Sequence, residues 1–180
     1  MTQKMLVALV EDIYEDLELW YPKLRAEEAG YTVRLAAPAL RTYQGKHGYP
    51  AIADMLIRDV RCADFAGLLV PGGFMPDKLR RDPAVLSLTR EFFEAGKLVA
   101  FICHGGWIPI SANILQGKRA TGSLGIKDDL DNAGAIWVDK AVVIDGNLIS
   151  SRTPKDLPGF GKAVVDFLDQ WTVPGAPAPA

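Results

Sequence analysis

The stretch that decides the fold reads Leu98-Val99-Ala100-Phe101-Ile102-Cys103-His104-Gly105-Gly106-Trp107. Its first five residues are apolar without interruption, which predicts a buried strand. The apolar spacing of residues 108–115 predicts a short helix directly afterwards. The chain must therefore turn sharply at Cys103, at the carboxyl end of a strand and beside the start of a helix. This is the pattern of a nucleophile elbow, with cysteine in the place of serine.

The position of Cys103 predicts a reactive thiol. The positive end of a helix favours an anion, so we expect a lowered pKa for this thiol. Gly105 and Gly106 permit the tight backbone that an elbow needs. The alternative is a small core residue, which is the usual role of a cysteine at the end of an apolar strand. Whether the neighbouring His104 acts as its base depends on geometry, which the sequence leaves open.

Working outward, strands and helices alternate along the chain. Strand, helix and strand within about 35 residues form a βαβ unit, which predicts a parallel sheet. A hairpin is expected late in the chain, around Asp145-Gly146-Asn147. The fold class is therefore α/β: a three-layer, flavodoxin-like sandwich with a doubly wound, mostly parallel sheet. Residues 1–172 are expected to form a single domain, and the Pro/Ala-rich residues 173–180 a disordered tail.

Composition excludes several classes of function. The chain has 180 residues, 49 % of them hydrophobic, and a net charge of −2, so nothing favours nucleic acid or an anionic membrane. No apolar run approaches the roughly 20 residues of a membrane span. The N-terminus lacks a signal-peptide pattern, and two cysteines make no disulfide framework, so a cytoplasmic location is expected. With only two histidines and two dispersed cysteines, we expect no structural metal site.

Three polar loops should meet at the carboxyl edge of the sheet, where ligands bind in such folds. They are residues 11–16, 71–77 and 103–107. Gly72 and Gly73 follow a strand, and their N–H groups can form an oxyanion cradle, although on its own the pair is equally consistent with a plain turn.

A carboxylic acid close to the thiolate could share a proton with it. The first loop and the helix after it offer five candidates, which also suit a helix start and which the residues alone do not separate: Glu11, Asp12, Glu15, Asp16 and Glu18. His47 is expected in a solvated turn. Cys62 has no cradle beside it and is expected to be structural.

Six motifs together resemble one known family. They are Tyr14-Glu15-Asp16-Leu17-Glu18-Leu19 with Tyr21-Pro22, Gly45-Lys46-His47-Gly48-Tyr49, Leu69-Val70-Pro71-Gly72-Gly73, Ile102-Cys103-His104-Gly105, the run from Gly125 to Gly134, and the run from Asp145 to Arg152. The chain resembles the ThiJ/PfpI superfamily, the group of the parkinsonism-associated protein and of the archaeal intracellular protease PfpI. The likeness runs from about Val7 to Leu168 and is strongest to the PfpI branch.

The resemblance implies a role for individual residues. Cys103 matches the easily oxidised nucleophile, and Glu15 matches the acid that hydrogen-bonds it. His104 matches the histidine of the PfpI-type triad, whose third member is an acid from an adjoining subunit. Asp77 stands where that branch usually has this glutamate. The backbone N–H groups of Gly73 and His104 would form the oxyanion hole, with Gly72 in the same cradle.

Two departures from the family pattern concern the pocket. The family usually continues Cys-His-Gly with proline and a polar or small residue, whereas this chain has Gly106 and Trp107. We expect Trp107, together with Tyr14, in the pocket, where the indole would narrow the mouth or shield the sulfur. Asp77 is one methylene shorter than glutamate, which shortens its reach to His104.

The resemblance implies a cysteine-dependent stress-response enzyme that converts reactive carbonyls, such as methylglyoxal to lactate, without glutathione or cofactor. One alternative is an intracellular cysteine peptidase. Another is a redox-sensing or chaperone-like protein whose Cys103 is oxidised to a sulfinate. The last alternative is an α/β domain without a cysteine-based function, in which Cys103 is inert. Family members are dimers or hexamers, so an active site near a subunit interface is expected.

Overall fold

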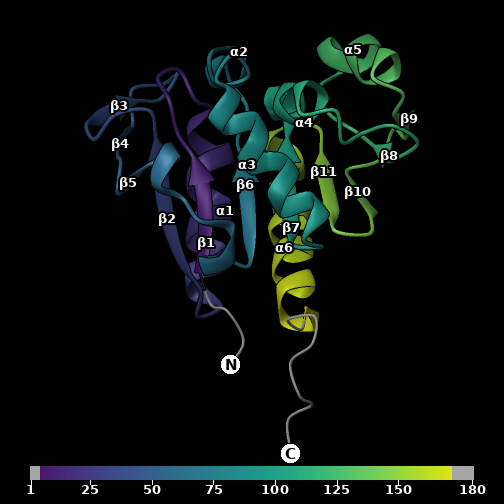
Figure 1. The fold of residues 1–180 in the computed structure, drawn as a ribbon. Helices are drawn as coiled ribbons and strands as arrows, with labels where there is room; N and C mark the ends of the chain where they lie inside the picture. Colours follow the sequence, from purple (N-terminus) through teal and green to yellow (C-terminus); the bar gives the residue numbers. More distant parts are fainter. Residues whose placement is uncertain (1–4, 172–180) are drawn as a thin grey trace, which may run out of the picture.

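The computed structural model describes residues 5–171, which form a three-layer α/β sandwich (Figure 1). The seven strands of the central sheet lie in the order β10-β11-β7-β6-β1-β2-β5. Helices α1 and α6 pack together on one face, and α2, α3 and α4 cover the other. The predicted fold class is confirmed. The predicted tail, residues 173–180, lies outside the described residues.

The strands are β1 Met5–Leu9, β2 Thr32–Ala37, β3 Thr42–Gln44, β4 Pro50–Ile52, β5 Met55–Leu56, β6 Gly67–Val70, β7 Leu98–Ile102, β8 Arg119–Ala120, β9 Ile136–Trp137, β10 Val142–Asp145 and β11 Leu148–Ser151. The α-helices are α1 Asp16–Glu28, α2 Met75–Leu79, α3 Pro83–Glu94, α4 Trp107–Ser111, α5 Lys127–Asn132 and α6 Leu157–Gln170. Within residues 5–171, no helix has the length and apolar character needed to cross a membrane.

The central sheet is parallel except at one edge. Strand β1 pairs in parallel with β2 and β6, β6 with β7, and β7 with β11. Strand β10 runs antiparallel to β11, which is the hairpin expected around Gly146. Every residue of β6 and β7 is buried, because helices cover both faces of a parallel sheet. The carboxyl ends of β1, β6 and β7 therefore lie side by side, as the site requires.

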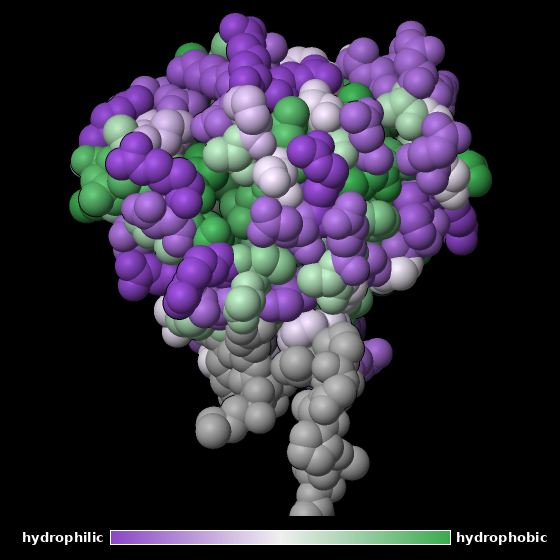
Figure 2. Space-filling view, viewed as in Figure 1, coloured by the Kyte–Doolittle hydropathy of each residue, from purple (hydrophilic) through white to green (hydrophobic). Residues whose placement is uncertain are grey.

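Two small sheets flank the central one. Strands β3 and β4 form an antiparallel hairpin, and β8 pairs with β9 in parallel. Figure 2 shows hydrophobic residues among hydrophilic ones at the left edge, the side on which Figure 1 places β3 and β4. The exposed Ile52 of β4 contributes to the apolar character of this hairpin.

The elbow after β7 is present. Cys103 adopts a φ of 58°, and a single turn over residues 103–106 leads into α4. This left-handed backbone is costly for any residue except glycine and tends to persist at functional sites. Ile13, in the loop after β1, has a φ of 66° and is strained in the same way. Two of the three non-glycine residues with positive φ within residues 5–171 thus stand at the same sheet edge.

Gly105 serves the elbow by close packing rather than by its own backbone angle. A Cβ atom at this position would lie 2.4 Å from the carbonyl oxygen of Val70 in β6. At Gly106 a Cβ atom would lie 2.9 Å from Cδ1 of Ile126. The sequence assigned the tight backbone to these glycines, but the left-handed residue is Cys103 itself. The glycines instead let the turn approach β6 and its neighbours.

We predict that Gly105→Ala destabilises the protein by about 1–3 kcal/mol, because a fixed backbone carbonyl leaves no room for the methyl group. The matched control is Gly125→Ala, whose Cβ atom would come no closer than 3.6 Å to another group. Urea unfolding of both variants measures the difference. Equal stability of the two variants would contradict the packing argument.

Candidate active site

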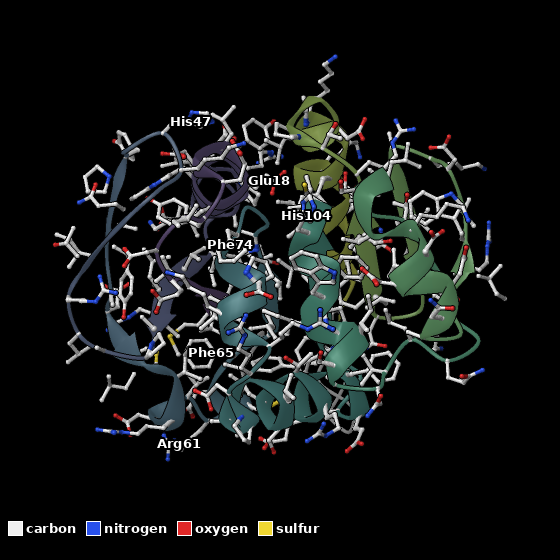
Figure 3. The ribbon with its side chains drawn as sticks, turned by 90° about the horizontal axis from the view of Figure 1, so that it is seen from above. Glu18, His47, Arg61, Phe65, Phe74 and His104 are labelled. Atoms are coloured by element: carbon white, nitrogen blue, oxygen red, sulfur yellow. The ribbon has the colours of Figure 1, made fainter. Side chains whose placement is uncertain are left out.

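A pocket of about 590 Å³ opens at the carboxyl edge of the sheet, above Cys103. The three predicted loops all contribute to it, and the hairpin turn between β3 and β4 adds a fourth wall. The lining residues are Ile13, Glu15, Glu18, Lys46, His47, Gly73, Phe74, Cys103, His104, Trp107 and Pro154. Seen from above, Glu18 lies between His47 and His104 (Figure 3).

The acid beside the cysteine is Glu18, not Glu15 as the resemblance implied. The Glu18 side chain comes from the first turn of α1 and is 2 % exposed. Its Oε2 accepts a 2.9 Å hydrogen bond from the N–H of Gly72. A Cβ atom on Gly72 would lie 2.5 Å from that oxygen and 2.9 Å from Cβ of Cys103, so carboxyl and thiol flank the same glycine. Glu18 is one of the five acids that the residues alone left open.

Burial changes the chemistry of this pair. It raises the pKa of Glu18 to about 8, with a smaller contribution from the negative charge of Glu15. Burial also raises the pKa of Cys103 to about 12, and the charge of Glu18 adds to the shift. The N–H of His104 and the hydroxyl of Ser123 oppose that shift. Because Glu18 is neutral below pH 8, its repulsion of a thiolate disappears there.

The direction of the Cys103 shift is opposite to the sequence-based expectation. A lowered pKa was expected from the helix that follows the elbow. That helix, α4, has only five residues, and it starts after an intervening turn. Desolvation, followed by the charge of Glu18, raises the pKa of Cys103. The thiol therefore needs a proton acceptor at hand in order to react.

His104 provides a proton acceptor. Its Nδ1 lies 3.2 Å from Sγ of Cys103, within hydrogen-bond range for sulfur. Burial lowers the pKa of His104, with a further contribution from the charge of Lys46, so the ring is neutral at pH 7. A neutral imidazole at this distance can take the thiol proton. The structure therefore places His104 in contact with the sulfur, and its role as the base stays a prediction.

Glu15 lines the same pocket but faces other partners. Its Oε2 lies 3.4 Å from Nζ of Lys46, and its Oε1 lies 3.5 Å from Nε2 of His47. The His47 side chain is exposed in a turn, as expected, yet it also borders the pocket. Lys46 belongs to one of the six family motifs, but no role was predicted for it, and Ser123 stands in a loop without a periodic pattern.

The backbone cradle is smaller than predicted. The Gly72 N–H is used by Glu18, which removes it from the predicted oxyanion hole. The His104 N–H is directed at Cys103. Gly73 lines the pocket, and no acceptor within residues 5–171 takes its N–H. Gly73 is therefore the available donor for a developing oxyanion.

Of the two residues predicted to lie in the pocket, Trp107 and Tyr14, only Trp107 lines it. Trp107 lines the pocket, with its ring centroid 5.1 Å from that of His104 and its Nε1 donating a 2.9 Å bond to Asp129. Tyr14, by contrast, is fully buried beneath the rim, where its hydroxyl donates to the carbonyl of Tyr49, and it forms no part of the pocket. The indole does not seal off the sulfur, because Cys103 and Trp107 both line the pocket; that Trp107 narrows the pocket stays a prediction.

Asp77 lies on α2 and forms an ion pair with Arg81, four residues further along the chain. It is not among the residues lining this pocket. Its predicted contact with His104 runs between subunits, and that contact stays a prediction.

One group within residues 5–171 has the spacing of a metal site: Glu15, Asp16 and His47, whose ligand atoms lie within 4.8 Å of one another. Both oxygens of Asp16 already accept backbone N–H bonds, and the ammonium of Lys46 stands beside Glu15. These contacts describe a hydrogen-bonded scaffold that a cation would have to displace.

We predict that the free energy of unfolding falls between about pH 5 and pH 8 because of Glu18. Its pKa in the folded protein is raised to about 8 from 4.5, so the folded state binds more protons in this window. The stability that this group contributes is complete below the unfolded pKa and is lost as the pH rises through 8. Urea unfolding across this range should give a shallower slope for Glu18→Gln.

The matched control is Glu28→Gln, which removes an exposed acid from the same helix. We expect it to retain the slope of the unmodified protein. A Glu18→Gln slope equal to that of the control would contradict the buried, protonated carboxyl.

Comparison with known proteins places the chain in a family. Residues 3–167 match the model of the DJ-1/PfpI family. The chain is 43 % identical over 160 residues to Deglycase PH1704 of Pyrococcus horikoshii, covering 89 % of this chain and 96 % of the relative. It is 42 % identical over 166 residues to the putative cysteine protease YraA of Bacillus subtilis, covering 92 % of this chain and 98 % of that relative.

Among solved structures, a two-domain protein of Anabaena variabilis with DJ-1/ThiJ/PfpI-like and ferritin-like domains matches with a TM-score of 0.91 and 39 % identity, over 92 % of this chain and 48 % of that one. Sequence and fold agree over the same residues that build the elbow and the pocket. The chain therefore belongs to the DJ-1/PfpI family.

Proposed function

We propose that the protein is a cysteine-dependent enzyme acting on reactive carbonyls, of the glutathione-independent glyoxalase or deglycase type. Its simplest substrate would be a 2-oxoaldehyde such as methylglyoxal, and its product the hydroxy acid lactate. The observation that carries the proposal is the 3.2 Å approach of His104 Nδ1 to the Cys103 sulfur beside a carboxyl with a pKa of about 8. Relatives named deglycase support the same class of reaction.

The residues allow a complete sequence of steps. His104 takes the thiol proton, and the sulfur of Cys103 attacks the aldehyde carbon to give a hemithioacetal. The Gly73 N–H stabilises the oxygen that becomes negative. A base removes the proton from the former aldehyde carbon, and the electrons move to the neighbouring carbonyl to give an enediol. Protonation of that neighbouring carbon, with loss of the hydroxyl proton from the carbon bonded to sulfur, gives a thioester. Water hydrolyses the thioester, which releases the hydroxy acid and restores the thiol.

Proton transfer through the enediol needs a group that gains and loses a proton near neutral pH. A pKa of about 8 suits Glu18 to this task, because it is protonated in the resting site and a modest base once ionised. His104 Nδ1 lies 3.2 Å from the sulfur and can carry the second proton. The two groups thereby divide the acid and base roles.

A cysteine peptidase is the second candidate, and the relative named putative cysteine protease YraA favours it. That reaction needs His104 to protonate an amine leaving group. A third reading is a redox sensor whose Cys103 stops at a sulfinate. Each makes a different product from the same thiol, so product analysis separates the three.

We predict multiple turnovers of methylglyoxal to lactate without glutathione. Cys103→Ala should abolish turnover, because it removes the nucleophile. His104→Gln should lower the rate by about 100-fold, in the range for loss of a general base. Glu18→Gln should cost more than Glu15→Gln, because Glu18 is the acid against the thiol. Enzymatic assay of D- and L-lactate over time measures each rate.

Cys62→Ser is the matched control for thiol chemistry, since Cys62 lies outside the pocket and is not bonded to Cys103. It should turn over like the unmodified protein. One stoichiometric adduct, without lactate, would overturn the carbonyl enzyme and favour the redox reading. Cleavage of peptides that depends on Cys103, again without lactate, would favour the peptidase.

We also propose that the protein is a cytoplasmic homodimer or hexamer, with the site near a subunit interface. Several large apolar side chains are more than half exposed on α1, the β3–β4 turn and β4: Leu17 and Leu24 at 57 %, Tyr49 at 59 % and Ile52 at 70 %. Apolar groups gathered in this way are typical of an interaction surface. Two unpaired cysteines suit a reducing compartment.

Sedimentation velocity at micromolar concentration should give the mass of two or six subunits. Leu17→Glu together with Ile52→Glu should shift the distribution towards the monomer, because two charges would be buried in the interface. Lys162→Glu, on the exposed side of α6, serves as the control. A monomer of the unmodified protein would contradict the proposal.

A further inference from the structure

The turn between β3 and β4 is held by buried groups that the proposed reaction does not use. The carboxylate of Asp16, which is 8 % exposed, accepts 2.9 Å bonds from the N–H groups of both His47 and Tyr49. The N–H of Lys46 donates to the carbonyl of Tyr14 at 2.8 Å. The buried hydroxyl of Tyr14 donates to the carbonyl of Tyr49. The backbone of this turn is therefore fixed from below at successive residues.

Gly45 belongs to the same scaffold. A Cβ atom there would lie 2.3 Å from Oδ1 of Asp16, so only glycine lets the turn close on this carboxylate. The side chains that the turn presents towards the pocket are Lys46 and His47. A rigid scaffold that displays two nitrogen donors at the mouth of a reactive pocket has the form of a recognition element.

Glu15 holds both donors in place. Its two oxygens lie 3.4 Å from the Lys46 ammonium and 3.5 Å from His47 Nε2, while the carboxylate itself is only 12 % exposed. The Lys46 and His47 side chains are 55 % and 65 % exposed. A lysine ammonium has three donors, and a single carboxylate contact leaves the others free to bind an incoming acceptor.

The charge of Lys46 acts inside the pocket. It is the one lysine or arginine among the residues that line this pocket within residues 5–171. Its charge lowers the pKa of His104 and opposes the rise in the pKa of Glu18. A negative group bound near Lys46 would therefore lie within the electrostatic reach of the reacting groups.

We propose that Lys46 and His47 form a carboxylate-binding subsite, so that the preferred substrates are carbonyl compounds that also carry a carboxylate. A monoanion fits better than a phosphate dianion, because the carboxylate of Glu15 stands beside both donors. The substrate class rests on the proposed function, whereas the subsite itself can be tested without turnover.

The first test uses the thiol alone. N-ethylmaleimide and 3-maleimidopropionate share one reactive group and differ by a carboxylate. Mass spectrometry gives the rate of Cys103 labelling by each reagent in a Cys62→Ser background. We expect the anionic reagent to react about three to five times faster relative to free cysteine, as suits one partly exposed charge contact. Lys46→Met should remove this preference, and Lys46→Arg should retain it.

Lys162→Met is the matched control, since it removes an exposed ammonium that is ion-paired on α6. We expect it to keep the preference of the unmodified protein. His47→Ala should weaken the preference in part, because one of two donors is lost. Equal labelling by the two reagents in the unmodified protein, or the same ratio in Lys46→Met, would overturn the subsite.

The second test uses turnover of phenylglyoxal and 4-carboxyphenylglyoxal. We expect the carboxylate to raise kcat/KM by a similar factor, and Lys46→Met to remove that gain. Turnover of both compounds at equal kcat/KM would contradict the substrate class. If neither compound is turned over while the maleimide preference is present, the proposed function fails and the subsite stands.

Discussion

The structure depends on one buried carboxyl group. Glu18 enters the interior from the first turn of α1 and accepts the N–H of Gly72, which ties the start of that helix to the loop after β6. Its second oxygen, Oε1, is buried without a hydrogen-bond partner within residues 5–171. An ionised carboxylate in that position would be poorly solvated, so the group keeps its proton to about pH 8. The packing around Glu18 therefore keeps its carboxyl protonated next to the thiol.

The same packing explains why the thiol is held in a strained backbone. At a φ of 58° Cys103 leaves the strand abruptly, and its Sγ lies close to both His104 and the carboxyl of Glu18. An extended backbone would instead continue β7. The cost of a left-handed residue is about 1–3 kcal/mol, which the close fit of Gly105 against β6 and the buried strands around it can sustain. The strained backbone at Cys103 therefore lowers the stability of the fold and places the sulfur atom in the site.

The sequence predicts the layers, the parallel sheet, the late hairpin and the elbow, because each follows from an apolar run and its turn residues. It does not predict which acid meets the cysteine. Glu15 and Glu18 lie three residues apart on the same side of a helix start, and only the approach of the β6 loop decides which one is buried. The sequence also could not predict that the Gly72 N–H is taken by Glu18 and lost to the oxyanion hole. Its acceptor lies 54 residues away in the sequence. Contacts between distant segments carry no local signal.

Glu15 and Glu18 show how the environment gives two identical side chains different protonation states. Both border the same pocket, Glu15 as the residue that precedes α1 and Glu18 from the first turn of that helix. The outer carboxylate faces Lys46 and His47 and acts as a fixed negative charge that orients them. The inner one has lost its water, and the charge of the outer one further favours its protonated form. A neutral acid next to the sulfur and a charged acid at the mouth thus support each other, so that replacing Glu15 would alter Glu18 as well.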